Sequence, residues 1–152
     1  MIKLWTYSIL MIAVGVLTLG ACVSMDPPPA SMDPLPASFK TADTTLGKVL
    51  ADNNGMTLYI FDKDDPGMSS CKDKCATAWP PVMADASAKA TGKFSIITRD
   101  DGAKQWAYDK MPLYGWFKDK KPGDVTGDSV GGVWHVVHPA GTGKTGWPNY
   151  TY

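Results

Sequence analysis

The chain has 152 residues, 15 basic and 15 acidic side chains, and no formal net charge at pH 7. This balance gives no electrostatic reason to expect binding to nucleic acid or to an anionic surface. Every acidic residue is Asp, and 15 Gly and 12 Pro make the chain poor in helix formers and rich in turn formers. Six Trp, six Tyr and four Phe favour strands, so the composition predicts β structure with many tight turns.

The first 21 residues have the features of a signal peptide. Lys3 supplies a positive start, residues 4–19 are almost entirely apolar, and Gly20 and Ala21 precede Cys22. The end of this segment resembles a bacterial lipobox, in which the Cys is acylated and becomes the mature N-terminus. An ordinary secretory signal and a single membrane span are the alternatives, although a span needs roughly 20 apolar residues and this run is shorter.

A lipid on Cys22 would anchor the protein stably, because each buried CH₂ group contributes about 0.8 kcal/mol. The two residues directly after Cys22 are Val23 and Ser24, and neither is Asp. In a Gram-negative cell we therefore expect the outer membrane, with the protein facing the periplasm or the cell surface.

Residues 22–38 are predicted to be a tether. Two related heptads, 24–30 and 31–37, contain five prolines, which favour polyproline II or disorder. A Pro-rich docking ligand is the alternative function for this segment.

The folded part is predicted to cover residues 39–138, followed by a Gly-rich tail at 139–152. Residues 47–51 and 56–61 are expected to form a hairpin, because Asn54-Gly55 between β-prone runs is a strong turn signal. Residues 71–79 are expected to form a short helical turn, which Pro80-Pro81 ends.

The remaining predicted strands lie in the second half of the chain, at residues 94–98, 104–108, 113–117 and 133–138. Asp100-Asp101-Gly102 and Asp109-Lys110 supply the turns between the first three of them.

Three cysteines become two if Cys22 carries a lipid. Cys71 and Cys75 would then lie outside the cytoplasm, where disulfides persist, so we predict a structural disulfide between them. A metal pair or a redox couple is the alternative. The spacing is not the Cys-x-x-Cys of redox motifs, and no second Cys pair completes a zinc site.

The folded region contains an internal duplication, because three pairs of aromatic anchors recur at one constant offset. The pattern Tyr-x-aromatic-x-x-Asp occurs at Tyr59 and again at Tyr114. The difference 114 − 59 equals 94 − 39 for a Phe pair and 134 − 79 for a Trp pair. The signature residues are Tyr59, Phe61, Asp64, Tyr114, Trp116 and Asp119. The sequence therefore predicts an all-β fold, a small antiparallel barrel or sandwich built from repeats 39–93 and 94–138 about a pseudo-twofold axis.

These segments together are similar to the secreted-repeat lipoproteins, a bacterial family recognised by the same signature. The match runs through 58–64, 71–81, 101–102, 105–108, 112–114 and 133–137. One departure is Lys110, where we expect Gly, because the turn needs a positive φ and Lys110 would then be strained. The resemblance implies a fold and an address but no activity.

The signature rings are expected to pack in the core, and the signature Asp side chains to accept backbone N–H groups in their loops. An aromatic ligand platform and a shared ligand or metal site are the alternatives. The two histidines, His135 and His138, are weak metal candidates because their odd separation on a strand sends them to opposite faces.

No catalytic constellation or cofactor motif emerges, so we expect a non-enzymatic binding or structural module that needs no cofactor. Its partners would be the membrane, through Cys22, and an unidentified envelope component. The alternative is a metal-binding or redox accessory lipoprotein.

Overall fold

The computed structural model describes residues 35–139. Seven strands and little helix occur there, so the fold is all-β as predicted. The elements are β1 Phe39–Thr44, β2 Gly47–Asp52, β3 Tyr59–Phe61, α1 Lys74–Ala78, β4 Phe94–Thr98, β5 Lys104–Tyr108, β6 Met111–Pro112, the 3₁₀ helix η1 Val130–Gly132 and β7 Trp134–Val136. The predicted signal peptide, Cys22 and most of the predicted tether and tail lie outside the described residues.

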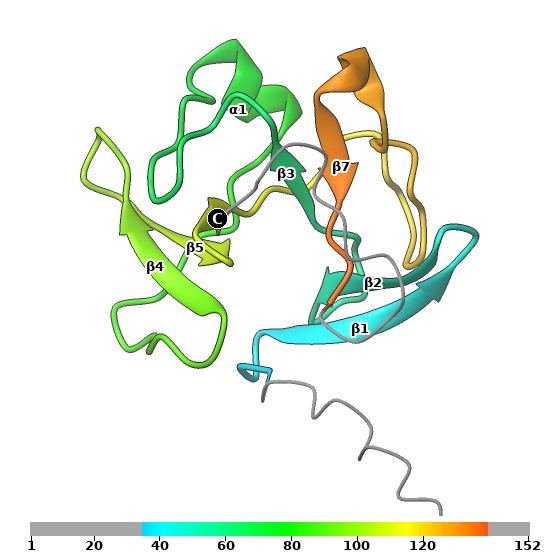
Figure 1. Cartoon of the computed structure of the whole chain (residues 1–152), viewed down its shortest axis with the longest axis horizontal. Coiled ribbons are helices and arrows are strands. Elements are labelled where there is room, and N and C mark those ends of the chain that lie inside the picture. The colour runs from blue at the N-terminus through cyan, green and yellow to red at the C-terminus, as the bar shows by residue number, and fades with distance from the viewer. Residues whose placement is uncertain (1–34, 140–152) are drawn as a thin grey trace, which may run out of the picture.

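The strands form three small open sheets rather than a closed barrel, with orders β1-β2, β3-β7 and β4-β5-β6. All strand pairs are antiparallel. In Figure 1 the β1–β2 hairpin and the β4–β5 hairpin lie on opposite sides, with β3 between them. Each hairpin is formed by the first two strands of one repeat, so the two sides of the molecule are built from equivalent segments.

The two repeats exchange their last segments. Strand β7, at the end of the second repeat, pairs with β3 of the first repeat, and Tyr59 lies opposite Val136. The equivalent segment of the first repeat pairs with the second, where Pro81 forms a bridge to Tyr114 and Val82 N donates to Leu113 O at 2.9 Å. Neither repeat therefore completes its own sheet.

The pseudo-twofold axis can be followed through the three pairs of anchor residues, whose members contact each other. The rings of Phe39 and Phe94 stack with their centroids 4.7 Å apart. Tyr59 and Tyr114 exchange two backbone hydrogen bonds of 2.8 and 2.9 Å. The rings of Trp79 and Trp134 stack at 3.8 Å. Each anchor of the duplication in the sequence is thus a contact across the axis.

Two hydrophobic clusters fill the interior along this axis. One surrounds the phenylalanine pair and contains the buried residues Phe39, Leu50, Leu58, Ile60, Phe94, Trp106, Tyr108, Met111, Leu113 and Val137. The other surrounds the tyrosine and tryptophan pairs and contains Val49, Tyr59, Cys71, Trp79, Tyr114, Trp134 and Val136. Both clusters draw on both repeats, so the burial of apolar surface that stabilises the fold requires both.

Two predicted strands differ from the structure. The predicted strand at 113–117 is wrong, because the strand of this region is β6 at Met111–Pro112 and Tyr114 makes only isolated bridges. Beyond Tyr114 the chain turns away, with Gly115 N donating to Pro80 O and Phe117 N to Ala78 O. The predicted hairpin of 47–51 with 56–61 is only partly present. The full partner of β2 is β1, and the other edge of β2 makes a single bridge from Ala51 to Thr57 and a bond from Leu58 N to Leu50 O.

Two local predictions are confirmed. Asp109 and Lys110 have φ values of 51° and 69°, so Lys110 has the left-handed backbone that normally favours Gly. The positive φ at both positions lets β5 return directly into β6, with Tyr108 opposite Met111. The predicted helical turn after Cys71 is present as α1.

Candidate functional site

The polar groups of the signature residues pair crosswise between the repeats. The hydroxyl of Tyr59 donates to Asp119 Oδ2 at 2.7 Å, and the hydroxyl of Tyr114 donates to Asp64 Oδ2 at 2.5 Å. Each tyrosine of one repeat therefore binds the aspartate of the other. We call these four side chains the Tyr–Asp clasp. It lies at the centre of the molecule, with both tyrosines fully buried and the aspartates 3% and 6% exposed.

The second oxygen of each carboxylate is satisfied by its own loop. Asp64 Oδ1 accepts the backbone N–H of Ser70 at 2.7 Å and its hydroxyl at 2.8 Å. Asp119 Oδ1 accepts the backbone N–H of Thr126 at 3.1 Å and its hydroxyl at 2.6 Å. The predicted role of these aspartates as acceptors of loop N–H groups is confirmed. Each carboxylate receives three donors, as a buried charge requires.

Burial shifts the acidity of the clasp. Burial first, and then the hydrogen bond to Asp119, raises the pKa of Tyr59 far above its ordinary value. Burial and the bond to Asp64 do the same to the pKa of Tyr114. Burial also raises the pKa of Asp64, although its donors and the nearby Arg99 oppose that shift. The tyrosines therefore stay protonated and act as permanent hydrogen-bond donors, and not as general bases near neutral pH.

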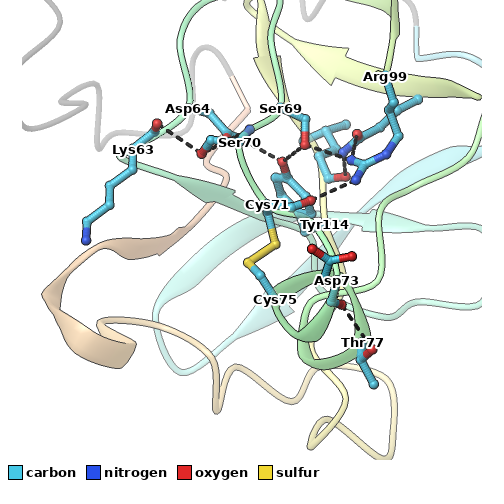
Figure 2. Close-up of a disulfide and its surroundings, with 12 residues drawn as sticks. Lys63, Asp64, Ser69, Ser70, Cys71, Asp73, Cys75, Thr77, Arg99 and Tyr114 are labelled. Atoms are coloured by element: carbon cyan, nitrogen blue, oxygen red, sulfur yellow. Dashed lines mark hydrogen bonds between the residues drawn. A yellow bond between two sulfur atoms is a disulfide. The ribbon is translucent and has the colours of Figure 1, made fainter. Parts of the chain in front are cut away.

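The chain's one arginine, which follows β4 in the second repeat, supports the clasp by binding the loop of the first repeat that carries Asp64 (Figure 2). Arg99 Nη1 donates to Ser69 Oγ at 2.7 Å and to Gln105 Oε1 at 2.6 Å, and Nη2 donates to the carbonyl of Cys71 at 2.7 Å. Ser69 Oγ in turn lies 2.7 Å from the hydroxyl of Tyr114. The guanidinium thus joins the β4–β5 hairpin to the loop that carries Asp64.

A surface depression adjoins Arg99. It is lined by Ser69, Lys72, Asp73, Ala76, Arg99, Asp100 and Asp101. Its two cations already have partners, because Lys72 pairs with Asp100 and Arg99 makes the bonds given above. The lining thus combines two cations with three aspartates, and the depression presents no single-sign surface to a ligand.

Cys71 and Cys75 form the predicted disulfide, with their Cα atoms 5.2 Å apart. Figure 2 shows it beside the Arg99 network, at the start of α1. Cys71 is fully buried, and the carbonyl of Cys75 accepts the backbone N–H of Trp79 at 2.7 Å. The bridge thus fixes the short helix whose end places Trp79 on the pseudo-twofold axis.

The signature aromatics Phe61 and Trp116 belong to a stack of four rings that alternates between the repeats. Phe61 lies 4.2 Å from Trp134, Trp134 lies 3.8 Å from Trp79, and Trp79 lies 3.9 Å from Trp116, measured between ring centroids. Phe61 and Trp116 form the two ends and are half-buried, while the two central rings are buried. These aromatics pack as predicted, and they lie at opposite ends of the stack and not on one shared platform.

The space around Trp116 is tight on the inner side. A Cβ atom on Gly127 would lie 2.8 Å from Tyr59 and 3.0 Å from Trp116, so only Gly fits between these rings. The indole N–H of Trp116 is buried and has no hydrogen-bond partner among the described residues. An unpaired buried donor of this kind costs about 1–3 kcal/mol.

The structure does not bring the two histidines together. His135 Nε2 lies 3.0 Å from Asp62 Oδ2, and His138 Nδ1 lies 2.9 Å from the carbonyl of Lys48. Within residues 35–139, no group of three or more His, Cys, Asp or Glu side chains is placed to hold a metal ion. The two weak metal candidates thus have separate local partners.

Sequence reasoning identifies all four clasp residues but not their pairing. It also does not identify Arg99, Ser70 and Thr126 as their partners. The available signal is weak: a hydroxyl residue occurs 6 residues after Asp64, at Ser70, and 7 residues after Asp119, at Thr126. The sequence gives no signal for Arg99, because it is the chain's one arginine and belongs to neither signature motif.

Among residues 35–139, no helix combines the length and apolarity that crossing a membrane requires. Comparison with curated proteins and with solved structures found no match. A family model named Lipoprotein_15 matches residues 40–83 and 95–138, two stretches whose starts are separated by the same offset as the aromatic anchors. They cover more than half of the chain and coincide with the two halves that meet at the axis. The chain therefore belongs to the family described as a secreted repeat of unknown function.

Proposed function

We propose that the protein is a lipid-anchored, non-enzymatic module of the cell envelope, held to the membrane through Cys22. The observation that carries this proposal is the closure of the Tyr–Asp clasp. Every hydroxyl and carboxylate oxygen of the repeated signature is occupied by another group of the same chain. The most distinctive residues of the chain thus build a scaffold, and they offer no free nucleophile, acid or base for a reaction.

The envelope address rests on separate features of the chain. The family is described as a secreted repeat, and a disulfide between Cys71 and Cys75 suits an oxidising compartment. The segment that ends at Cys22 has the features of a lipoprotein signal, and neither of the two residues directly after the Cys is Asp. Together these favour acylation at Cys22 and residence at the outer membrane of a Gram-negative cell.

The anchor is tested by Cys22→Ser in cells supplied with a labelled fatty acid. The wild-type protein should take up the label and sediment with outer-membrane vesicles on a density gradient. The variant should lose the label and appear in the soluble periplasm or the medium. Membrane sedimentation that persists in the unlabelled variant would contradict the anchor.

The scaffold role is tested by Asp64→Asn and Asp119→Asn, each of which removes one carboxylate from the clasp. Both variants should lower the free energy of unfolding by similar amounts, measured by urea denaturation, and leave acylation at Cys22 unchanged. A variant that folds with full stability would show that its carboxylate is kept for some other role.

A further inference from the structure

The pseudo-twofold axis provides an internal comparison between two loops that follow the signature strands. The first loop is Asp62-Lys63-Asp64-Asp65-Pro66-Gly67, and the second is Phe117-Lys118-Asp119-Lys120-Lys121-Pro122-Gly123. The buried clasp residue is Asp in both. Lys63 and Lys118 are also equivalent, and both are exposed. Three positions differ: Phe117 replaces Asp62, Lys120 replaces Asp65, and Lys121 is an insertion. The second loop therefore keeps the buried Asp of the first but has exchanged two acidic positions for an aromatic ring and a Lys.

The second loop presents an exposed aromatic ring together with two lysine side chains. Phe117 is 47% exposed, one of only three large apolar side chains with such exposure among the described residues. Lys118 Nζ lies 5.6 Å from the centroid of the Phe117 ring and 5.7 Å from that of Trp116. Lys120 Nζ donates to the backbone carbonyl of Phe117 at 2.7 Å, so this second cation is held against the same residue.

The loop is cationic although the whole chain is neutral. The negative charge of Asp119 is buried and bound to Tyr59 and Thr126. Lys121 pairs with Asp124 at 2.6 Å. Within the described residues, Lys118 and Lys120 have no carboxylate within ion-pair distance. This local excess of positive charge, next to an exposed ring, is hidden when charge is counted over the full sequence.

We propose that the loop of residues 116–121 docks the domain on the surface of an anionic lipid bilayer. The ring of Phe117 enters the boundary between headgroups and acyl chains, and Lys118 and Lys120 lie against the phosphates. Aromatic side chains prefer this boundary, and each Lys near an anionic surface strengthens binding about fivefold.

The docking rests on the proposed anchor, which places a membrane within reach. The segment that joins Cys22 to Leu35, the first described residue, is short. At about 3.3–3.6 Å per residue, it spans at most about 45 Å. A domain of about 100 residues has a radius of gyration of about 13 Å, so the loop can turn towards the membrane that holds the lipid. One acyl anchor and one cationic loop would together fix the orientation of the domain.

The test uses the chain from residue 22 onward with Cys22→Ser, which removes the lipid, after near-ultraviolet circular dichroism has verified its fold. Binding is measured by co-sedimentation with vesicles of phosphatidylglycerol and phosphatidylethanolamine, and with vesicles of phosphatidylcholine alone. We expect binding to the anionic vesicles only, and weaker binding as salt rises, because screening shortens the reach of surface charge. The triple variant Phe117→Ser, Lys118→Gln, Lys120→Gln should lower the affinity at least about 25-fold.

The matched control is the triple variant Met68→Ser, Lys63→Gln, Lys74→Gln, which also removes one exposed apolar side chain and two positive charges. It should bind the anionic vesicles as the starting chain does. An equal loss in the control, equal binding to phosphatidylcholine, or no binding to either vesicle would overturn the docking surface. None of these outcomes would affect the anchor, which the fatty-acid label on Cys22 tests independently.

Discussion

Tyr59 and Tyr114 form a reciprocal pair at the centre of the protein. The backbone N–H of Tyr59 donates to the carbonyl of Tyr114 at 2.8 Å, and the N–H of Tyr114 donates to the carbonyl of Tyr59 at 2.9 Å. The hydroxyl group of each tyrosine donates a hydrogen bond to the aspartate of the opposite repeat. One contact between two equivalent residues thus positions both halves of the Tyr–Asp clasp.

Crosswise pairing predicts which residues are energetically coupled. In a double-mutant cycle, Tyr59→Phe and Asp119→Asn should show a coupling energy of about 1 kcal/mol or more, because they remove a hydrogen bond to a charged group. The control cycle combines Tyr59→Phe with Asp64→Asn. These two residues belong to one signature but do not bind each other, because each binds a residue of the opposite repeat. Its coupling should be near zero. Urea denaturation of the single and double variants measures both, and stronger coupling within a signature than between repeats would contradict the clasp.

The raised pKa of each clasp tyrosine predicts alkaline unfolding. Above about pH 10 the tyrosines of the unfolded chain lose protons that the folded chain keeps, so the unfolded state binds fewer protons. Stability is then fully present below pH 10 and is lost as the pH rises toward the folded pKa values. Each tyrosine should lower the free energy of unfolding by about 1.4 kcal/mol per pH unit in this window.

The alkaline prediction is checked by urea denaturation at a series of pH values from about 9 to 11.5. Tyr59→Phe and Tyr114→Phe should each remove one tyrosine's share of the slope. A slope that is unchanged in both variants would show that other groups cause the alkaline loss.

The exchange of last segments predicts that the repeats fold only together. A fragment of residues 35–88 lacks β7, and a fragment of residues 89–139 lacks the segment around Pro81 that pairs with Tyr114. Each fragment alone should show an unfolded far-ultraviolet circular dichroism spectrum. An equimolar mixture should recover the strand spectrum and the near-ultraviolet signal of stacked tryptophans. If either fragment folds by itself, each repeat has its own core and the exchange is not required.

Much of the local structure could be predicted from the sequence. Strands β4 and β5 follow from apolar and aromatic runs between Asp- and Gly-rich turns, and the helical turn follows from the prolines after Trp79. Strand β1 could not be predicted, because Phe39–Thr44 has no apolar alternation: Phe39 is its one buried residue, and the rest of the strand depends on backbone pairing with β2. The sequence favours residues 56–61 as the partner of β2 instead, and these only touch its other edge.

The pairing between the repeats could not be predicted, because a constant offset between two signatures fits two arrangements equally well. Each Tyr could bind the Asp of its own repeat or that of the other. The structure decides through β3, where Tyr59 lies on the axis while Asp64 follows a turn that carries it away, toward Tyr114. A choice of this kind depends on the tertiary path of the chain, which a repeat in the sequence does not contain.

The four-ring stack predicts similar costs for truncation at its two ends. Phe61→Ala and Trp116→Ala each remove an end ring that is half-buried against a tryptophan, so each should lower the free energy of unfolding by about 3 kcal/mol, the low end for aromatic truncations. Trp116→Phe keeps a ring on Trp79 and removes the unpaired indole N–H, so its cost should be below about 1 kcal/mol. Urea denaturation of the three variants provides the measurement. Near-normal stability of Trp116→Ala would show that this ring contributes little to the scaffold and belongs functionally with the exposed loop that begins at Phe117.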